Sequence, residues 1–263
     1  MRSEPVKEVA VRRVNGLSGF DDKDFLAAEA PLEIRVEGSS VAVVMRTPGD
    51  DRELAAGFLV TEGLVRALND IVDIISDGCN VVNVRLRTPE SMDLKKLTRH
   101  VFTSSSCGIC SKASIDAVRQ QFPPVEDHCS VSPQVLPGLV RSLASAQETF
   151  KRTGGLHACA LFDLAGRLLA LREDVGRHNA LDKVVGWALM ENRLPLRGHM
   201  LLLSGRASFE MMQKALAAGV PIVAAISAPS SLAAEFARES GQTLIGFLRG
   251  DKMNIYAGAE RIE

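Results

Sequence analysis

The first third of the chain alternates apolar and polar residues in a pattern that predicts antiparallel strands. Residues 31–38 alternate apolar and charged side chains, and a Gly-Ser-Ser turn leads from them into the apolar run 41–46. Two such runs joined by a short turn are typical of a β-hairpin. A second hairpin is expected from the apolar runs 71–75 and 81–86, which bracket another short turn. Residues 1–100 are therefore expected to form a small α+β domain.

One helix is expected within this region. Asp50 and Asp51 stand where a helix N-cap is expected, and the apolar residues behind them recur at helical spacing. The residues that share this apolar face are Leu54, Ala55, Phe58 and Leu59. Glu53 has no evident partner in the sequence, and we interpret it as a solvated surface residue.

The second half of the chain alternates helical and strand patterns. Helices are predicted over residues 136–143, 180–190, 209–218 and 231–238. Strands are predicted over residues 156–162, 168–171, 200–203, 222–226 and 243–247. The run 222–226 is apolar throughout, as in a strand that is covered on both faces. This alternation favours an α/β fold, a three-layer sandwich, over residues 133–263.

Composition and charge exclude several classes of function. Hydrophobic residues make up 46% of the chain and charged residues 24%, which suits a soluble globular protein with a sizeable core. The formal net charge of −1 argues against a general nucleic-acid binder. No stretch approaches the roughly 18 apolar residues of a membrane span, and residues 1–15 lack the apolar core of a secretory signal. We expect a cytoplasmic protein with no nucleic-acid or membrane partner.

The five cysteines include one Cys-x-x-Cys pair, Cys107 and Cys110, in a small, polar stretch rich in serine. In a cytosolic chain, such a pair is more often redox-active, metal-binding or catalytic than part of a disulfide framework. The thiolate is the nucleophile, and a following helix together with Lys112 would lower the pKa of a cysteine placed here. We interpret residues 101–132 as a mobile loop and a short helix, with the cysteines acting as nucleophile or carrier.

Other functions for this pair stay open. A structural zinc site needs two further ligands, and the sequence offers no second Cys-x-x-Cys or paired histidines at finger spacing. His157 and Cys159 are the nearby candidates. A thioredoxin-like motif should directly follow a strand, whereas a serine-rich loop precedes this one. We expect no metal site, and we interpret Cys79 and Cys129 as bystanders and Cys159 as a core residue.

Three basic segments each follow or end a predicted strand. These segments, 172–179, 204–208 and 247–252, carry Arg177, Arg206 and Arg249. Ligands of open α/β sheets bind beyond the carboxyl ends of the strands, and helix N-termini bind phosphates. The three arginines could therefore converge on an anionic small molecule. Each segment also fits an ordinary strand end with a solvated charge and a helix cap.

Two histidines lie near these segments. His178 is a candidate general acid/base or hydrogen-bonding ligand, or else a structural residue near a helix start. His157 lies in an apolar strand, and we interpret it as a core residue.

Several segments together resemble the formate dehydrogenase accessory sulfurtransferases, the FdhD family. The resemblance covers most of the chain except about thirty N-terminal residues and residues 88–98. It rests on residues 53–63, 107–110, 155–160, 173–183, 204–214 and 246–247.

This resemblance implies a function. Members of the family take sulfur from a cysteine desulfurase as a persulfide on the Cys-x-x-Cys loop. They pass it to the molybdenum cofactor, in its bis(molybdopterin guanine dinucleotide) form, before that cofactor is inserted into formate dehydrogenase. By position, Cys107 would carry the persulfide and Cys110 would assist. The resemblance also implies a cytidine-deaminase-like fold for the C-terminal domain and a homodimer that binds the cofactor across the pair.

The resemblance further implies a cofactor-binding segment, formed by Phe247, Leu248, Arg249, Gly250, Asp251 and Lys252. Together with Arg177, His178 and Arg206, these residues would form the cofactor site, because the two pyrophosphates of the cofactor suit several separate cationic strand ends. Asp251 adds a negative charge where an anionic ligand would approach. Zinc deaminase chemistry is not expected, since Cys159 stands where His-x-Glu would place its glutamate. The alternative function is a cofactor-binding chaperone without sulfur chemistry.

Overall fold

A computed structural model describes residues 4–89 and 122–263 of the protein. The predicted sequence segment 101–132 falls largely outside this range. Cys107 and Cys110 lie outside the described residues, and so does nearly all of the short helix expected just after them. The other sequence-based predictions can be compared with the structure directly.

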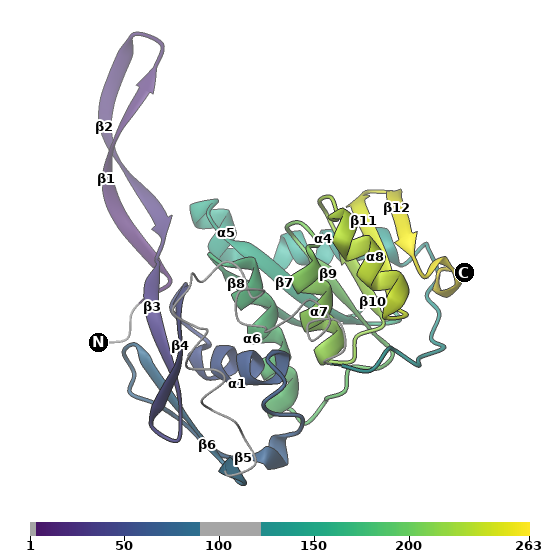
Figure 1. Ribbon diagram of the computed structural model, residues 1–263. Helices are drawn as coiled ribbons and strands as arrows, with labels where there is room; N and C mark the ends of the chain where they lie inside the picture. Colours follow the sequence, from purple (N-terminus) through teal and green to yellow (C-terminus); the bar gives the residue numbers. More distant parts are fainter. Residues whose placement is uncertain (1–3, 90–121) are drawn as a thin grey trace.

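The N-terminal part contains a four-stranded sheet in the order β4-β3-β6-β5 (Figure 1). Its strands are β3 (Ala30–Val36), β4 (Ser39–Arg46), β5 (Ile71–Ser76) and β6 (Val81–Leu86). The pairs β3–β4 and β5–β6 are antiparallel, so both predicted hairpins are confirmed, and β3 and β6 pair in parallel. Along β3, Leu32, Ile34 and Val36 are buried and alternate with more exposed residues, as expected for a sheet with one covered face.

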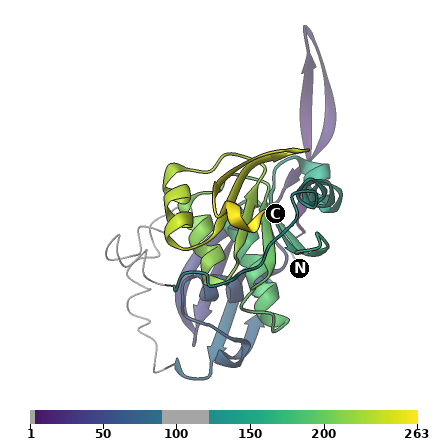
Figure 2. The same cartoon turned by 90° about the vertical axis from the view of Figure 1, so that its right-hand side faces the viewer.

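A long hairpin precedes this sheet, and the sequence analysis did not predict it. Its strands are β1 (Val6–Asn15) and β2 (Ser18–Ala27), which pair in antiparallel register over their whole length. It projects away from the rest of the protein (Figures 1 and 2). Most of its residues are exposed, so it lacks the buried alternating face by which a strand is usually recognised in a sequence.

The second half of the chain forms a six-stranded sheet in the order β12-β11-β10-β9-β7-β8. The strands are β7 (His157–Asp163), β8 (Leu168–Asp174), β9 (His199–Leu203), β10 (Ile222–Ala225), β11 (Thr243–Arg249) and β12 (Lys252–Ala257). Strands β9, β10 and β11 are parallel to one another, whereas β7 is antiparallel to both β8 and β9, and β12 is antiparallel to β11. The sequence analysis missed β12.

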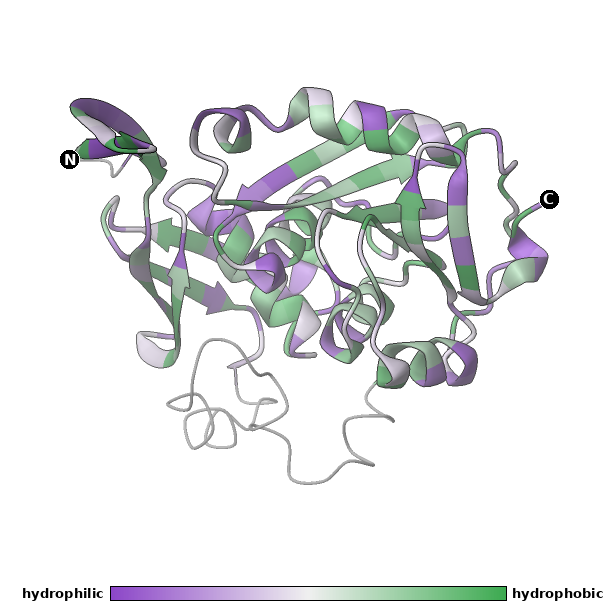
Figure 3. Cartoon of the chain, turned by 90° about the horizontal axis from the view of Figure 1, so that it is seen from above, coloured by the Kyte–Doolittle hydropathy of each residue, from purple (hydrophilic) through white to green (hydrophobic). Residues whose placement is uncertain are grey.

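Helices cover both faces of this sheet. The helices of this half are α4 (Leu136–Ala146), α5 (Glu148–Thr153), α6 (Arg177–Met190), α7 (Phe209–Ala217) and α8 (Ser231–Glu239), of which the short α5 packs beside β2 of the hairpin and not on the sheet. Leu136, Leu139 and Leu143 of α4 pack against one face, and α6, α7 and α8 pack against the other. Apolar strands therefore lie between two helical layers (Figure 3), which confirms the predicted three-layer α/β sandwich. Two 3₁₀ turns, at Leu68–Asp70 and Ala259–Arg261, complete the described elements.

Helix α1 (Asp51–Thr61) joins the two halves, because it crosses α6 between the two sheets. A β-carbon on Gly57 would lie 1.8 Å from the carbonyl oxygen of Asp182, and one on Gly186 would lie 1.8 Å from that of Glu53. Only glycine allows the two backbones to approach this closely. One apolar core runs through this crossing from the small sheet to the large one. The boundary between residues 1–100 and 133–263 stays a prediction.

The predicted N-cap position at the start of α1 is confirmed, although no side-chain hydrogen bond caps the helix there. Asp50 occupies the cap position in a left-handed conformation, with φ of 55°, and its side chain makes no capping hydrogen bond. Asp51 instead pairs with Arg46. None of the helices among residues 4–89 and 122–263 is long and apolar enough to cross a membrane.

Candidate functional site

The three basic segments lie at one edge of the six-stranded sheet. Strands β8, β9 and β11 run in the same direction, because each of β8 and β9 is antiparallel to β7 and because β9 and β11 are both parallel to β10. Their carboxyl ends lead to Arg177, Arg206 and Arg249. We call this region the strand-end site. It consists of residues 174–178, 204–210 and 247–252 and of the start of β7. The three basic segments therefore lie at the same end of this sheet, and their convergence on one anion stays a prediction.

Arg177 and His178 form the first turn of α6, which begins three residues before the predicted start at 180. Asp174 holds this turn in place. Its Oδ1 accepts hydrogen bonds from the backbone N–H of Gly176 and from Nδ2 of Asn179, both at 2.9 Å. Gly176 itself cannot cap the helix with a side chain, so this aspartate and the helix dipole define the electrostatics of the turn.

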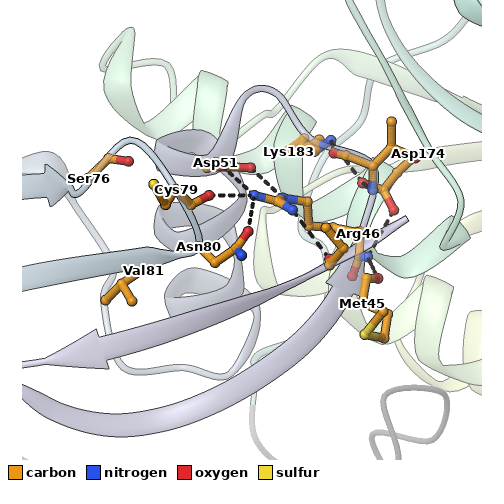
Figure 4. A network of polar contacts seen from close by, with 12 residues as sticks. Met45, Arg46, Asp51, Ser76, Cys79, Asn80, Val81, Asp174 and Lys183 are labelled. Atoms are coloured by element: carbon orange, nitrogen blue, oxygen red, sulfur yellow. Dashed lines mark hydrogen bonds and ion pairs between the residues drawn. The ribbon is translucent and has the colours of Figure 1, made fainter. Parts of the chain in front are cut away.

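Asp174 is itself fixed by a buried network between the two halves of the protein. Its Oδ2 lies 2.8 Å from Nζ of Lys183, and the two side chains are 0% and 1% exposed. The same oxygen accepts the backbone N–H of Thr47, and Nζ of Lys183 donates to the carbonyl oxygen of Thr47 at 3.0 Å. Figure 4 shows this pair beside a second buried ion pair, in which Arg46 donates two hydrogen bonds to Asp51. The buried pair of Asp174 and Lys183 therefore fixes the start of α6, and with it this part of the strand-end site, to the N-terminal half of the protein.

His178 contacts a carboxylate of the neighbouring helix. Its Nε2 lies 2.7 Å from Oε2 of Glu210, with the two side chains 15% and 11% exposed. Glu210 is in the first turn of α7, where the helix dipole favours a negative charge. The contact, an ion pair when the imidazole is protonated, ties the first turn of α6 to the first turn of α7.

Several polar atoms at this edge lack partners within the part of the chain that the structure describes. The Nε atom of Arg177 and the Oγ atom of Ser208 are buried and make no hydrogen bond. Nε2 of His178 makes none either, since its contact with Glu210 has the distance of an ion pair but not the geometry of a hydrogen bond. Ser208 is the N-cap residue of α7, yet its hydroxyl does not cap the helix. Arg206 is exposed. Buried polar atoms are normally satisfied, so these unpaired atoms, together with Arg206, are suited to bind an oxygen-rich anion.

Residues 247–252 form the end of β11, a tight turn and the start of β12. Phe247 has a φ of 53°, which is unusual for a bulky residue and costs energy of order 1–3 kcal/mol. Its ring is 37% exposed, and the guanidinium of Arg249 lies 5.7 Å from the ring centroid. Arg249 also donates from Nε to the carbonyl oxygen of Ile226 at 3.2 Å. The turn therefore presents an aromatic face and a fixed cation at the edge of the site.

The remaining residues of this segment differ in their exposure. Leu248 is 0% exposed and packs in the core, so its side chain does not face a ligand at this edge. Gly250 adopts a φ of 54° that permits the turn. Asp251 and Lys252 are exposed.

His157 also belongs to the site, although the sequence analysis interpreted it as a core residue. It is the first residue of β7 and is partly exposed. Burial lowers its pKa, and the positive charges of Arg177, His178 and Arg206 lower it further. The ring is therefore close to all three cationic residues. Because β7 is antiparallel to β8 and β9, its amino end lies beside their carboxyl ends. The direction of a strand within a sheet cannot be read from its local sequence, so the sequence analysis missed this placement.

Residues 27–263 match the model of the FdhD/NarQ family. The chain belongs to the FdhD/NarQ family. A "Sulfur carrier protein FdhD" of Mycolicibacterium paratuberculosis is 53% identical over 90% of this chain and 91% of its own length. Proteins of the same description from Streptomyces avermitilis and Sulfurisphaera tokodaii are 52% and 43% identical, over 91% and 98% of this chain and 89% and 99% of their own lengths. These names support a sulfur-carrier role.

A solved structure shares the fold of this family member. It is that of a proposed formate dehydrogenase accessory protein from Desulfotalea psychrophila, with a TM-score of 0.80 and 24% sequence identity. The likeness covers 98% of this chain and 99% of that chain. The likeness thus supports the predicted fold over nearly the whole chain. At this level of identity it supports the fold alone and assigns no role to individual residues.

The FdhD-like segment 173–183 divides into two sets of residues in the structure. Asp174, Asn179 and Lys183 are buried and hold α6 against the N-terminal half. Arg177 and His178 lie at the strand-end site. This segment therefore combines residues that hold α6 in place with residues that lie at the strand-end site.

Glu53 corrects another sequence-based interpretation. Its carboxylate accepts two hydrogen bonds from Arg172, from Nε at 2.5 Å and from Nη2 at 2.8 Å, and the glutamate side chain is only 17% exposed. These hydrogen bonds raise the pKa of Arg172. Glu53 thus binds α1 to β8 and is not solvated surface, and Arg172 faces α1 and not the strand-end site.

The cysteines among the described residues have no evident role at this site. Cys159 is fully buried, as predicted, and burial raises the pKa of its thiol. Burial also raises the pKa of Cys129, and Cys79 is exposed. Residues 4–89 and 122–263 contain no group of three potential metal ligands. Since Cys107 and Cys110 lie outside these ranges, the expectation that they bind no metal stays a prediction.

Proposed function

We propose that this protein is a sulfur carrier that transfers persulfide sulfur to a nucleotide-containing molybdenum cofactor. Membership of the FdhD/NarQ family and the names of its relatives support the sulfur-carrier part of the proposal. The observation that supports the cofactor part is that the strands leading to Arg177, Arg206 and Arg249 end at the same end of the sheet, where buried polar atoms lack partners in the described chain.

Sulfur would enter at Cys107. The thiolate of Cys107 attacks the outer sulfur of a persulfide on a cysteine desulfurase, so that a new S–S bond forms and the desulfurase thiolate leaves. The proton of the Cys107 thiol is lost to solvent before the attack, and Cys110 assists. A low thiol pKa favours this step, and the basic residue Lys112 nearby in the sequence would provide it.

The acceptor would be bound at the strand-end site. Delivery of the outer sulfur to it as sulfide would release the thiolate of Cys107 and would take up two electrons, which the reduced cofactor would supply. Bis(molybdopterin guanine dinucleotide) carries two pyrophosphate groups, and guanidinium groups bind phosphate oxygens in paired hydrogen bonds. Arg177, His178 and Arg206 would bind phosphate, and residues Phe247–Lys252 would bind the nucleoside part. The exposed ring of Phe247 suits stacking on a flat base.

The rest of the proposal concerns partners. The protein would act as a sulfurtransferase in the cytoplasm, as a homodimer that binds the cofactor across the pair. It would deliver the sulfurated cofactor to formate dehydrogenase, whose activity would depend on it.

Mass spectrometry after incubation with a cysteine desulfurase and free cysteine tests the entry of sulfur. We expect an adduct of about 32 Da, one sulfur atom, on the peptide that contains Cys107. The Cys107→Ala protein should lack it, and the Cys79→Ala protein, altered at an exposed cysteine, should keep it. Normal cofactor binding without any adduct would show a chaperone without sulfur chemistry. Stoichiometric zinc that is lost on Cys110→Ala replacement would contradict the carrier proposal.

A further inference from the structure

The sheet places His157 between the two loops that carry Arg177 and Arg206. In the strand order β9-β7-β8, β7 lies between the two strands that lead to these loops. His157, at the start of β7, pairs in register with Asp174, the last residue of β8. On its other side, the backbone N–H of Ser204 donates to the carbonyl oxygen of Ala158 at 3.0 Å. The imidazole therefore lies at the centre of the cationic edge.

The loop after β9 lies directly against this ring. A β-carbon on Gly205 would come within 3.1 Å of Nδ1 and 3.3 Å of Cε1 of His157. Such a contact is tight for a side chain, and glycine avoids it. Oγ of Ser204 accepts the backbone N–H of Ala158 at 2.8 Å, which holds the loop to the strand. His157 and the loop that carries Arg206 are therefore fixed relative to each other.

We propose that His157 is a third ligand of the anion bound by Arg177 and Arg206, and that anion binding protonates its imidazole. This inference rests on the proposed function in one respect only: the natural anion would be a phosphate group of the cofactor. The buried Nε of Arg177 and Oγ of Ser208, which lack partners among the described residues, are further polar atoms available to such a ligand.

The electrostatics of the ring give the direction of this coupling. Its pKa lies below the ordinary value, first because burial disfavours the charged ring and then because neighbouring charges act on it. The charged and titratable groups that act on the ring are Arg177 and His178 of α6, Arg206 of the loop after β9, and Asp174 of β8, which alone raises its pKa. A bound dianion would offset the cations, and an opposite charge in contact raises a histidine pKa by about 1–3 units.

The sign of the pH dependence follows from linkage. The complex binds one proton more than the free protein between the lowered and the raised pKa of His157. Affinity for the anion must therefore rise as the pH falls through this window, by at most about tenfold per pH unit for one proton. At a pH above both values, the arginines alone should bind the anion more weakly.

Nuclear magnetic resonance titration of the histidine rings tests this proposal, with sulfate as a probe that does not itself titrate near neutral pH. We expect the pKa of His157 to rise by about one unit on saturation with sulfate. His199, at the opposite end of β9, is the internal control and should not respond. The wild-type protein carries the test, so its outcome does not depend on the stability of a variant.

Two results would overturn the proposal. The first is that sulfate does not bind. The second is that sulfate binds at this site, as shown by weaker binding to Arg177→Gln or Arg206→Gln, but leaves the pKa of His157 in the wild type unchanged. In a supporting experiment, His157→Gln should abolish the pH dependence of sulfate affinity, whereas His199→Gln should preserve it. The two proposals fail separately. A persulfide on Cys107 with an unresponsive His157 would refute only this inference, whereas a responsive His157 without a persulfide would refute only the sulfur-transfer function.

Discussion

Nε2 of His178 lies 2.7 Å from Oε2 of Glu210, and the contact links the first turn of α6 to the first turn of α7. These two turns follow β8 and β9, the strands that lead to Arg177 and Arg206. The carboxylate of Glu210 thus fixes the orientation of a ring at the anion site from a neighbouring helix. We interpret Glu210 as a positioning residue of this site.

Replacement of Glu210 by alanine should weaken the binding of inorganic pyrophosphate by about tenfold. The reason is the loss of the close contact that holds the His178 ring, and a tenfold loss of affinity corresponds to about 1.4 kcal/mol. The variant Glu210→Gln keeps an oxygen for the ring and should restore most of the affinity. Calorimetric titration at neutral pH measures all three proteins. Equal affinities of the alanine and glutamine variants would show that Glu210 does not act by orienting His178.

Replacement of Lys183 by methionine should destabilise the protein by about 3–5 kcal/mol, because it leaves the carboxylate of Asp174 buried without its cation. The exposed Lys7→Met variant is the control and should change stability little. Urea unfolding monitored by circular dichroism gives both free energies of unfolding. A Lys183→Met protein as stable as the wild type would refute a structural role for this ion pair.

The crossing of α1 and α6 should not tolerate a methyl group. Gly57→Ala places a β-carbon 1.8 Å from the carbonyl oxygen of Asp182, so the helices must separate, at a cost of at least about 1–3 kcal/mol. Gly138→Ala in α4 is the matched control, since its β-carbon would meet nothing closer than 3.9 Å. That change should stabilise the protein by up to about 1 kcal/mol, because alanine is the better helix former. Thermal unfolding should therefore shift in opposite directions, and a shift in the same direction would contradict the helix crossing.

His157 should make stability depend on pH in the absence of anions. Its pKa in the folded protein lies below the ordinary value of about 6.5, mainly because the ring is buried. The unfolded chain therefore binds the proton more tightly, and the wild type should lose stability relative to His157→Gln as the pH falls below that value. The check is to compare the melting temperatures of both proteins at about pH 8 and pH 5 in a buffer without multivalent anions. A difference that stays constant between these pH values would contradict the low pKa of His157.

The sequence predicted the parts of the fold that bury regular apolar patterns. Residues 222–226 are apolar without interruption because β10 is covered on both faces, and Ile34 alternates with charged neighbours because β3 is covered on one face. The β1–β2 hairpin lacked both signals, since nearly all of its side chains are exposed. Strand β12 is also largely exposed, with only Ala257 buried.

The sequence predicted those site residues that follow a single recognisable strand. Arg177 and Arg206 were found because helices and strands alternate, and a rule of sheet topology then brings their loops together. His157 was misinterpreted because its role depends on β7 running against its neighbours, which no local pattern reveals. Glu53 was misinterpreted for a similar reason, since its partner Arg172 lies 119 positions away in the sequence.

Sulfur transfer from Cys107 to a bound cofactor is the central claim, and a single-turnover experiment with radioactive sulfur tests it most directly. The protein is loaded with labelled persulfide by a cysteine desulfurase, freed from the donor and mixed with reduced bis(molybdopterin guanine dinucleotide), which supplies the two electrons that the transfer needs. We predict that the label moves from the protein to the extracted cofactor in the wild type. The double variant Arg177→Gln, Arg206→Gln should form the persulfide normally and retain the label. Label that stays on the wild-type protein, or that moves equally well from the double variant, would contradict the account.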